Sequence, residues 1–195
     1  MIADWFITHE KDIKNGEIRV FALDESHVKA GEICGYGWGN RKLRREINVD
    51  NYQDSQTYYG ALDCISGELL LRKYSKANSS NTIDFINYLP AQSPGKKIVI
   101  VWDGASYHRS QEFRDFLSIV NHGVQKEVHC LRFAPYAPEE NPIENIWGQI
   151  KQILRHIHSR CRSFTITKKL FELFIEYHLF TMPDLSTYEA FSNLI

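Results

Sequence analysis

Three acidic residues, far apart in the chain, each follow or begin an element that the sequence predicts. Asp24 follows a short apolar strand, Asp103 follows an unbroken apolar run, and Glu144 lies in the first turn of a long helix. In an open α/β sheet, side chains that do chemistry collect at the carboxyl ends of strands and at the starts of helices. Mg²⁺ prefers oxygen ligands, and two such ions can support an in-line displacement at phosphorus. The three acids therefore predict a metal-dependent phosphoryl-transfer site.

Each acid also has an ordinary structural explanation. Aspartate at a strand end and the dipeptide Asp103-Gly104 both favour turns. The segment from Asn141 to Glu144 has the order of a helix start, with an N-cap residue, a proline and an acid in the first turn. Glu25 could replace Asp24 as a ligand, but neighbouring side chains of a strand point to opposite faces, so only one of the two can face the site. Spacing alone leaves these alternatives open.

The elements that would position these acids begin with strands and continue with strands and helices in alternation. Runs rich in β-branched and aromatic residues predict strands at residues 19–23, 33–38, 56–62, 68–74, 98–102 and 128–133. Apolar residues at helical spacing predict helices at residues 81–89, 113–120, 141–157 and 164–180. The run at residues 98–102 does not alternate, as expected for a strand buried on both faces. This order predicts an α/β fold with a mixed sheet and helices packed on both of its faces.

The composition is that of a folded protein with one domain, which we expect to span residues 1–195. The 195 residues are 43% apolar and 24% charged, which excludes disordered and fibrous classes, and the net charge of −1 says nothing about partners. Apolar runs fall far short of the ~20 residues that cross a bilayer, and the N-terminus lacks the basic start of a secretory signal. We therefore expect no membrane contact and a cytoplasmic location.

The four cysteines do not have the spacing of a metal or redox motif. Cys34, Cys64, Cys130 and Cys161 lie 30 or more residues apart. Zinc ribbons and thioredoxin-type sites need pairs at close spacing, so we expect four reduced thiols.

Positive charge is concentrated in two stretches that could contact DNA phosphates. One cluster follows the second predicted strand and contains Arg41, Lys42, Arg44 and Arg45. Residues 145–171 contain no acid and carry six basic residues, including Lys151, Arg155, Arg160 and Arg162. A solvated helix face would have the same composition, but beside a phosphoryl-transfer site we expect these residues to bind the DNA backbone.

Four segments occur in an order that resembles a known family. They are residues 21–26 (FALDES), 36–38 (YGW), 101–108 (VWDGASYH) and 131–147, the last of which contains the string P-Y-x-P-x-x-N-P-I-E-x-x-W. Over residues 18–160 the chain resembles the catalytic domain of insertion-sequence transposases in the bacterial branch of the mariner superfamily. The string that ends in Trp147 is the most specific part of this resemblance.

The resemblance implies an RNase H-like fold and a DDE triad of Asp24, Asp103 and Glu144. In that family two Mg²⁺ ions, which Mn²⁺ can replace, support DNA cleavage at transposon ends and transfer of the 3′-hydroxyl into target DNA, typically at TA. Asp24 would bridge the ions, and each of the other two acids would hold one. Two features depart from the family: 40 residues separate Asp103 from Glu144, more than in mariner-type proteins, and Gly104 stands where Asn is usual.

Other residues of these motifs have two interpretations each. His108 is predicted either to contact DNA phosphate or to orient Asp103, and simple packing is equally open. Trp147 is predicted as a core anchor of its helix. Trp38 also favours packing, although it could contact DNA near the site.

The resemblance also carries expectations about partners. Family members place helix-turn-helix units before the catalytic domain, whereas about seventeen residues precede the first predicted strand here. We therefore expect a helix-turn-helix partner polypeptide or a truncated chain, a homodimer in the DNA complex, nucleoid association, and weak DNA binding without preference for transposon ends by the chain alone. A ribonuclease H or junction resolvase, or an inactive transposase remnant that only binds, are the alternatives.

Overall fold

The sheet at the centre of the fold carries both predicted aspartates. The computed structural model describes residues 2–30, 54–122, 127–134, 137–157, 161, 163–192 and 194, which form five strands in the order β3-β2-β1-β4-β5. They are β1 (Ile18–Lys29), β2 (Ser55–Asp63), β3 (Leu69–Tyr74), β4 (Lys97–Trp102) and β5 (Val128–Arg132). β2 runs antiparallel to β1 and β3, whereas β4 runs parallel to β1 and β5. The sheet is mixed, which confirms the prediction.

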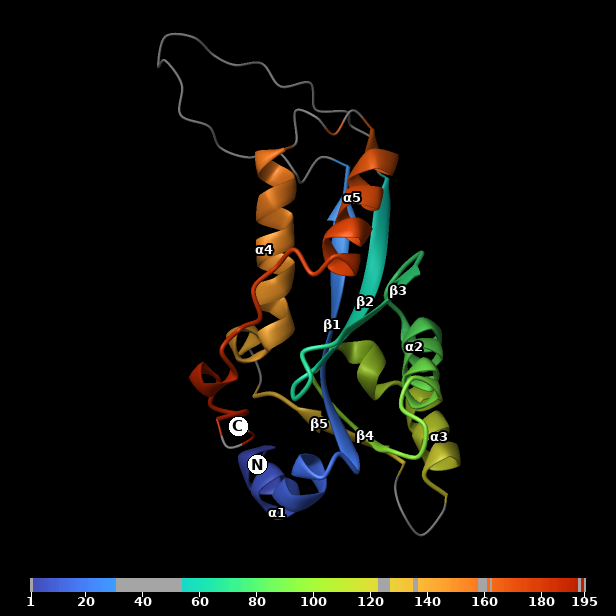
Figure 1. Ribbon diagram of the computed structural model, residues 1–195. Helices are drawn as coiled ribbons and strands as arrows, with labels where there is room; N and C mark the ends of the chain where they lie inside the picture. The colour runs from blue at the N-terminus through green and yellow to red at the C-terminus, as the bar shows by residue number, and fades with distance from the viewer. Residues whose placement is uncertain are drawn as a thin grey trace.

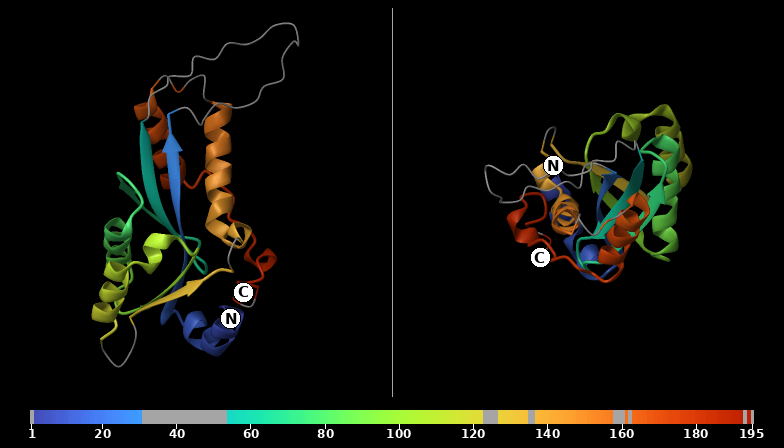
Figure 2. Two further views of the ribbon diagram at one scale, coloured as in Figure 1. Left: turned by 180° about the vertical axis from the view of Figure 1, so that it is seen from behind. Right: turned by 90° about the horizontal axis from the view of Figure 1, so that it is seen from above.

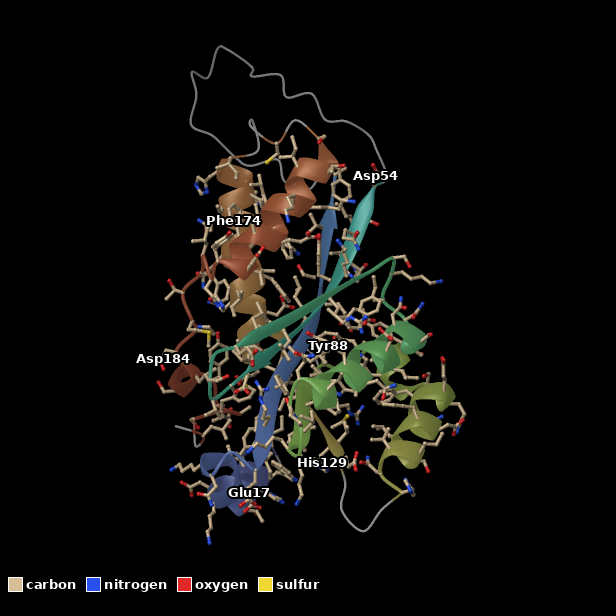
Figure 3. All side chains as sticks on the ribbon, turned by 45° about the vertical axis from the view of Figure 1, so that its right-hand side comes forward. Glu17, Asp54, Tyr88, His129, Phe174 and Asp184 are labelled. Carbon is tan, nitrogen blue, oxygen red and sulfur yellow. The ribbon has the colours of Figure 1, made fainter. Side chains whose placement is uncertain are left out.

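Helices cover both faces of the sheet (Figures 1 and 2). One face is covered by α4 (Pro142–His156) and α5 (Phe164–Glu176), with α1 (Ile2–Lys14) contributing to the same core; the other is covered by α2 (Ser79–Ala91) and α3 (Gln111–Val120). Short 3₁₀ turns are η1 (Ser106–Arg109), η2 (Pro138–Glu140) and η4 (Leu185–Thr187). Figure 3 shows side chains filling the space between helices and sheet, with Phe174 on α5 and Tyr88 on α2 labelled.

β4 contributes to both cores, as its unbroken apolar sequence predicts. Val99 and Val101 pack on the α4 side, and Ile98, Ile100 and Trp102 pack on the α2 side. Each is at most 1% exposed, because β4 lies inside the sheet between β1 and β5. The position just after β4, where Asp103 lies, is thereby fixed from both faces.

α4 packs on the sheet through one continuous apolar stripe. Its buried side chains after the first residue are those of Ile143, Ile146, Trp147, Ile150 and Leu154. This spacing of three and four residues places them on one face of the helix, toward the sheet. The stripe holds the first turn of α4, and with it Glu144, beside the strands.

Two predicted boundaries are wrong. Asp24 does not end its strand: β1 continues to Lys29 because β2 keeps pairing with it, from Phe21↔Asp63 to Lys29↔Ser55, after the pairing with β4 has stopped at Ala22↔Val101. The last helix, α5, ends at Glu176 rather than near residue 180, and His178 just beyond it has a left-handed backbone with φ of 50°. α1 was not predicted.

Several predicted features lie outside the described residues. They include the strand at residues 33–38 with its YGW segment, the basic cluster that begins at Arg41, and Cys34. Of the remaining cysteines, Cys64, Cys130 and Cys161 are free thiols, which agrees with the prediction. Among the helices of the described part, none has the length and apolar character to cross a membrane.

Candidate active site

The register of the sheet brings Asp24 and Asp103 together. β1 and β4 run parallel, and their pairing ends at Ala22↔Val101. Two residues further along each strand lie Asp24, still within β1, and Asp103, just after β4. Asp24 is partly buried, whereas Asp103 is exposed. Both residues therefore lie near the carboxyl end of β4.

Two hydrogen bonds attach the first turns of α4 to β1. The Asn141 Nδ2 atom donates to the Leu23 carbonyl oxygen at 3.1 Å, and the Trp147 Nε1 atom donates to Asp24 Oδ2, also at 3.1 Å. Glu144 lies three residues after Asn141 and three before Trp147, so it shares their side of the helix. These bonds place the exposed Glu144 side chain next to Asp24.

Asn141 does not cap α4 with its side chain, contrary to the prediction. It occupies the N-cap position, but its side chain makes no capping hydrogen bond. The amide instead reaches the backbone of β1, and its Oδ1 atom is buried without a hydrogen-bond partner. Asn141 thus links α4 to β1 and does not cap α4 with its side chain.

The charges of the three acids act on one another. Burial, followed by the negative charges of Glu144, Glu25 and Asp103, raises the pKa of Asp24 well above its usual value, and a hydrogen bond from the Glu25 backbone opposes this only in part. The residues that the sequence singled out from three distant segments therefore share one electrostatic environment.

Glu25 faces the opposite side of β1, as strand alternation predicts, and contacts His108. The His108 ring stacks on Trp102 with centroids 3.8 Å apart. Its Nε2 atom lies 3.3 Å from Glu25 Oε1, and its Nδ1 atom lies 3.2 Å from Asp103 Oδ1. The second contact has the distance of an ion pair but not the alignment of a hydrogen bond. His108 therefore lies between the two carboxylates.

The acids beside His108 favour the charged form of its ring. Burial opposes the charged ring, but the contacts with Asp103 and Glu25 outweigh it and raise the pKa of His108 to about 9. The same contact with His108 lowers the pKa of Asp103. Because the His108 side chain is only 1% exposed, its position favours the role of orienting Asp103 over that of contacting a phosphate.

The basic residues of α4 lie on the face that carries Glu144. Lys151 and Arg155 follow Glu144 by seven and eleven residues, which at 3.6 residues per turn is the same side of the helix. Arg155 is exposed and Lys151 partly so. The other predicted DNA-binding residues lie outside the described part of the chain: Arg41, Lys42, Arg44, Arg45, Arg160 and Arg162.

A divalent cation fits this site by the chemistry of its donors. Asp24, Asp103 and Glu144 supply carboxylate oxygens, which suit Mg²⁺ and Mn²⁺. Within the described residues, no three His, Cys, Asp or Glu side chains stand close enough to hold one ion. Asp103 and Glu144 are exposed, so packing does not fix their rotamers.

Sequence reasoning did not find the contacts that hold this site. The bond from Asn141 to Leu23, the bond from Trp147 to Asp24 and the contact of Glu25 with His108 join residues 83 to 123 positions apart. The one local signal was the position of Trp147, one helical turn after Glu144.

The chain is similar to one family and to several solved structures. The family described as DDE superfamily endonuclease matches residues 19–166. A pre-cleavage Mos1 transpososome matches with a TM-score of 0.62 and 12% identity, over 99% of this chain and 57% of that one. The Mos1 mariner paired-end complex with Mg gives 0.61 and 14%, over 99% and 58%. No curated protein sequence matches the chain.

The matches cover the present chain almost completely but not their own chains. The chain spans a little over half the length of these Mos1 structures. It covers 85% of the Mos1 transposase catalytic domain bound to Raltegravir with Mn, with a TM-score of 0.58, 13% identity and 99% of this chain covered. At such identities the likeness establishes the fold, which is RNase H-like as the resemblance implied.

Neutralising the two aspartates should change stability in opposite directions. In EDTA at pH 7, we expect Asp24→Asn to increase the free energy of unfolding, because it removes a buried charge that its neighbours repel. Asp103→Asn should decrease it, because the ionised group attracts His108. Urea unfolding measures both. A destabilised Asp24→Asn variant would show that the carboxylates do not repel one another.

The charge on His108 should make stability depend on pH. The pKa of His108 rises on folding from about 6.5 to about 9, so its contribution is complete below pH 6.5 and is lost as the pH passes 9. Between pH 6 and 10 without metal, wild type should lose about 3 kcal/mol more than His108→Gln. Parallel urea-unfolding series on the two proteins test this, and equal losses would contradict the buried ion pairs.

Proposed function

The chain belongs to the DDE superfamily endonucleases, and from this membership we propose that it is the catalytic domain of a transposase. The proposed reaction is metal-dependent cleavage of DNA at transposon ends, followed by transfer of the 3′-hydroxyl into target DNA at TA sites. The main support for the proposal is that Trp147 of α4 donates a hydrogen bond to Asp24, and that burial, followed by the charges of Glu144, Glu25 and Asp103, raises the pKa of Asp24.

The three acids and His108 would have distinct tasks. Asp24, Asp103 and Glu144 would together hold the two Mg²⁺ ions. Such ions polarise the attacking oxygen and stabilise the leaving oxygen at the phosphorus. His108, between Glu25 and Asp103, would orient the Asp103 carboxylate, because its ring is held in place by the stack on Trp102. No side chain needs to act as a covalent nucleophile.

DNA would lie along α4. One face of this helix carries Glu144, Lys151 and Arg155. When one phosphate of a DNA strand is bound at the acidic site, neighbouring phosphates of that strand can therefore contact the two basic residues. The predicted contacts of Arg41, Lys42, Arg44, Arg45, Arg160 and Arg162 belong to this proposal as well. The Mos1 matches are described as paired-end and transpososome complexes, which supports DNA as the partner.

The narrower parts of the proposal rest on the sequence motifs. The N-P-I-E-x-x-W string supports the bacterial insertion-sequence branch, where a homodimer would assemble on two transposon ends in the cytoplasm at the nucleoid. A separate helix-turn-helix polypeptide would supply recognition of the ends.

Loss of any one of the three acids should abolish nuclease activity. With Mg²⁺ or Mn²⁺ and a supercoiled plasmid, we expect Asp24→Asn, Asp103→Asn and Glu144→Gln each to lower the nicking rate at least about 10³-fold, since a metal ligand is lost. Glu10→Gln is the matched control, because this exposed acid lies on α1, away from the site. EDTA should stop nicking by wild type.

The same assay separates the proposal from its rivals. Preference for an RNA–DNA hybrid over plasmid DNA would favour a ribonuclease H. Nicking that survives in Asp24→Asn would overturn the assignment of the acids, and no metal-dependent nicking by wild type would favour an inactive remnant.

A further inference from the structure

The Asp24 carboxylate receives a hydrogen bond from a buried indole. Trp147 is 2% exposed, and its Nε1 atom donates to Asp24 Oδ2 at 3.1 Å. No other side chain in the described part of the chain donates a hydrogen bond to this carboxylate. Indole nitrogen is a donor only and carboxylate an acceptor only, so the contact has one direction and fixes which oxygen faces the ring. It leaves Oδ1 on the other side of the carboxylate.

The Trp147 ring packs on β2 at a glycine, where the strand has no side chain. Gly60 is paired with Asp24 across β1 and β2. A Cβ atom at Gly60 would lie 2.6 Å from Trp147 Cη2 and 2.9 Å from Ile143 Cδ1, closer than real Cβ contacts allow. A glycine at this position therefore makes room for the indole directly beside Asp24.

A second aromatic ring closes the seat. Phe171 of α5 stacks on Trp147 with centroids 5.9 Å apart and planes inclined by 27°. The indole is thus confined by Gly60 on the sheet and by Phe171 on α5, and its N–H is directed at the carboxylate. A buried indole N–H needs an acceptor, and here the acceptor is a carboxylate of the candidate site rather than a backbone carbonyl.

We propose that Trp147, seated against Gly60, is a positioning residue that holds the Asp24 carboxylate in the orientation needed to bind a divalent cation. This inference rests on the proposed function. Hydrogen bonds from outside the ligand set commonly determine how a carboxylate presents its oxygens to a metal, and their loss typically costs 10–100-fold in affinity or activity.

Binding of Mn²⁺ alone tests the inference without relying on activity. Trp147→Phe keeps an apolar ring but removes the N–H, so titration calorimetry should show a Kd for Mn²⁺ that is 10–100-fold higher than in wild type. Trp5→Phe is the matched control, because it removes an indole N–H on α1 and should leave the Kd unchanged. Circular dichroism at the same temperature checks that each variant is folded.

Two further variants isolate the hydrogen bond from packing. Benzothienylalanine at position 147 has the shape of tryptophan with sulfur in place of the N–H, and should weaken Mn²⁺ binding as Trp147→Phe does. Gly60→Ala displaces the Trp147 ring, so as a single substitution it should weaken Mn²⁺ binding. Added to Trp147→Phe it should weaken Mn²⁺ binding little further, because both substitutions remove the same hydrogen bond to Asp24.

The outcomes distinguish the two levels of inference. If wild type binds Mn²⁺, Asp24→Asn does not, and both position-147 variants bind as wild type does, the positioning role is overturned while the proposed function stands. If wild type does not bind Mn²⁺, or Asp24→Asn binds it equally well, the proposed function itself fails. A weakened Kd in both position-147 variants, with Trp5→Phe unchanged, supports the positioning role.

Discussion

Negative charge gathered beside the middle of β1 is the constraint on which the arrangement of this protein depends. Asp24 is partly buried, and this burial, followed by the negative charges of Glu144, Glu25 and Asp103, raises its pKa well above the usual value. The two apolar cores oppose that repulsion: β4 is buried on both faces, and the stripe of α4 holds Glu144 against the sheet. Packing elsewhere in the molecule thus helps to hold these acids near one another despite their repulsion.

Strand alternation gives two adjacent acids different environments. Asp24 faces α4 and receives the indole hydrogen bond, whereas Glu25 faces η1 and contacts His108. His108 in turn lowers the pKa of Asp103, so the site contains one carboxylate that resists ionisation and one that favours it. A single change of register in β1 would exchange Asp24 and Glu25 between these environments. The pairing of Asp24 with Gly60 therefore matters to the chemistry as well as to the fold.

The sequence predicted what local pattern determines and missed what depends on pairing across the chain. The mixed sheet, the strands at 56–62 and 68–74, the buried run at 98–102 and helix 141–157 follow from apolar patterning, and all are present. The end of β1 was wrong because it is set by β2, not by the residues after Asp24. The capping role of Asn141 was wrong because its amide bonds to Leu23, 118 residues away. The roles of the three acids stay predictions.

α4 shows why one helix can join an acidic site to basic residues. Glu144 lies in the first turn, where the helix dipole favours negative charge, and Arg155 and His156 lie in the last turn, where it favours positive charge. The dipole therefore offsets part of the repulsion that Glu144 meets from Asp24. Glu144, Lys151 and Arg155 lie on one side of α4. The exposed face of the helix therefore changes from negative charge at its N-terminal end to positive charge at its C-terminal end, which is also the arrangement that stabilises the helix. The basic end of α4 would attract a polyanion that lies along this face, and one of its phosphates could then reach the acids. The acids repel phosphate, so a bound cation would have to lie between them.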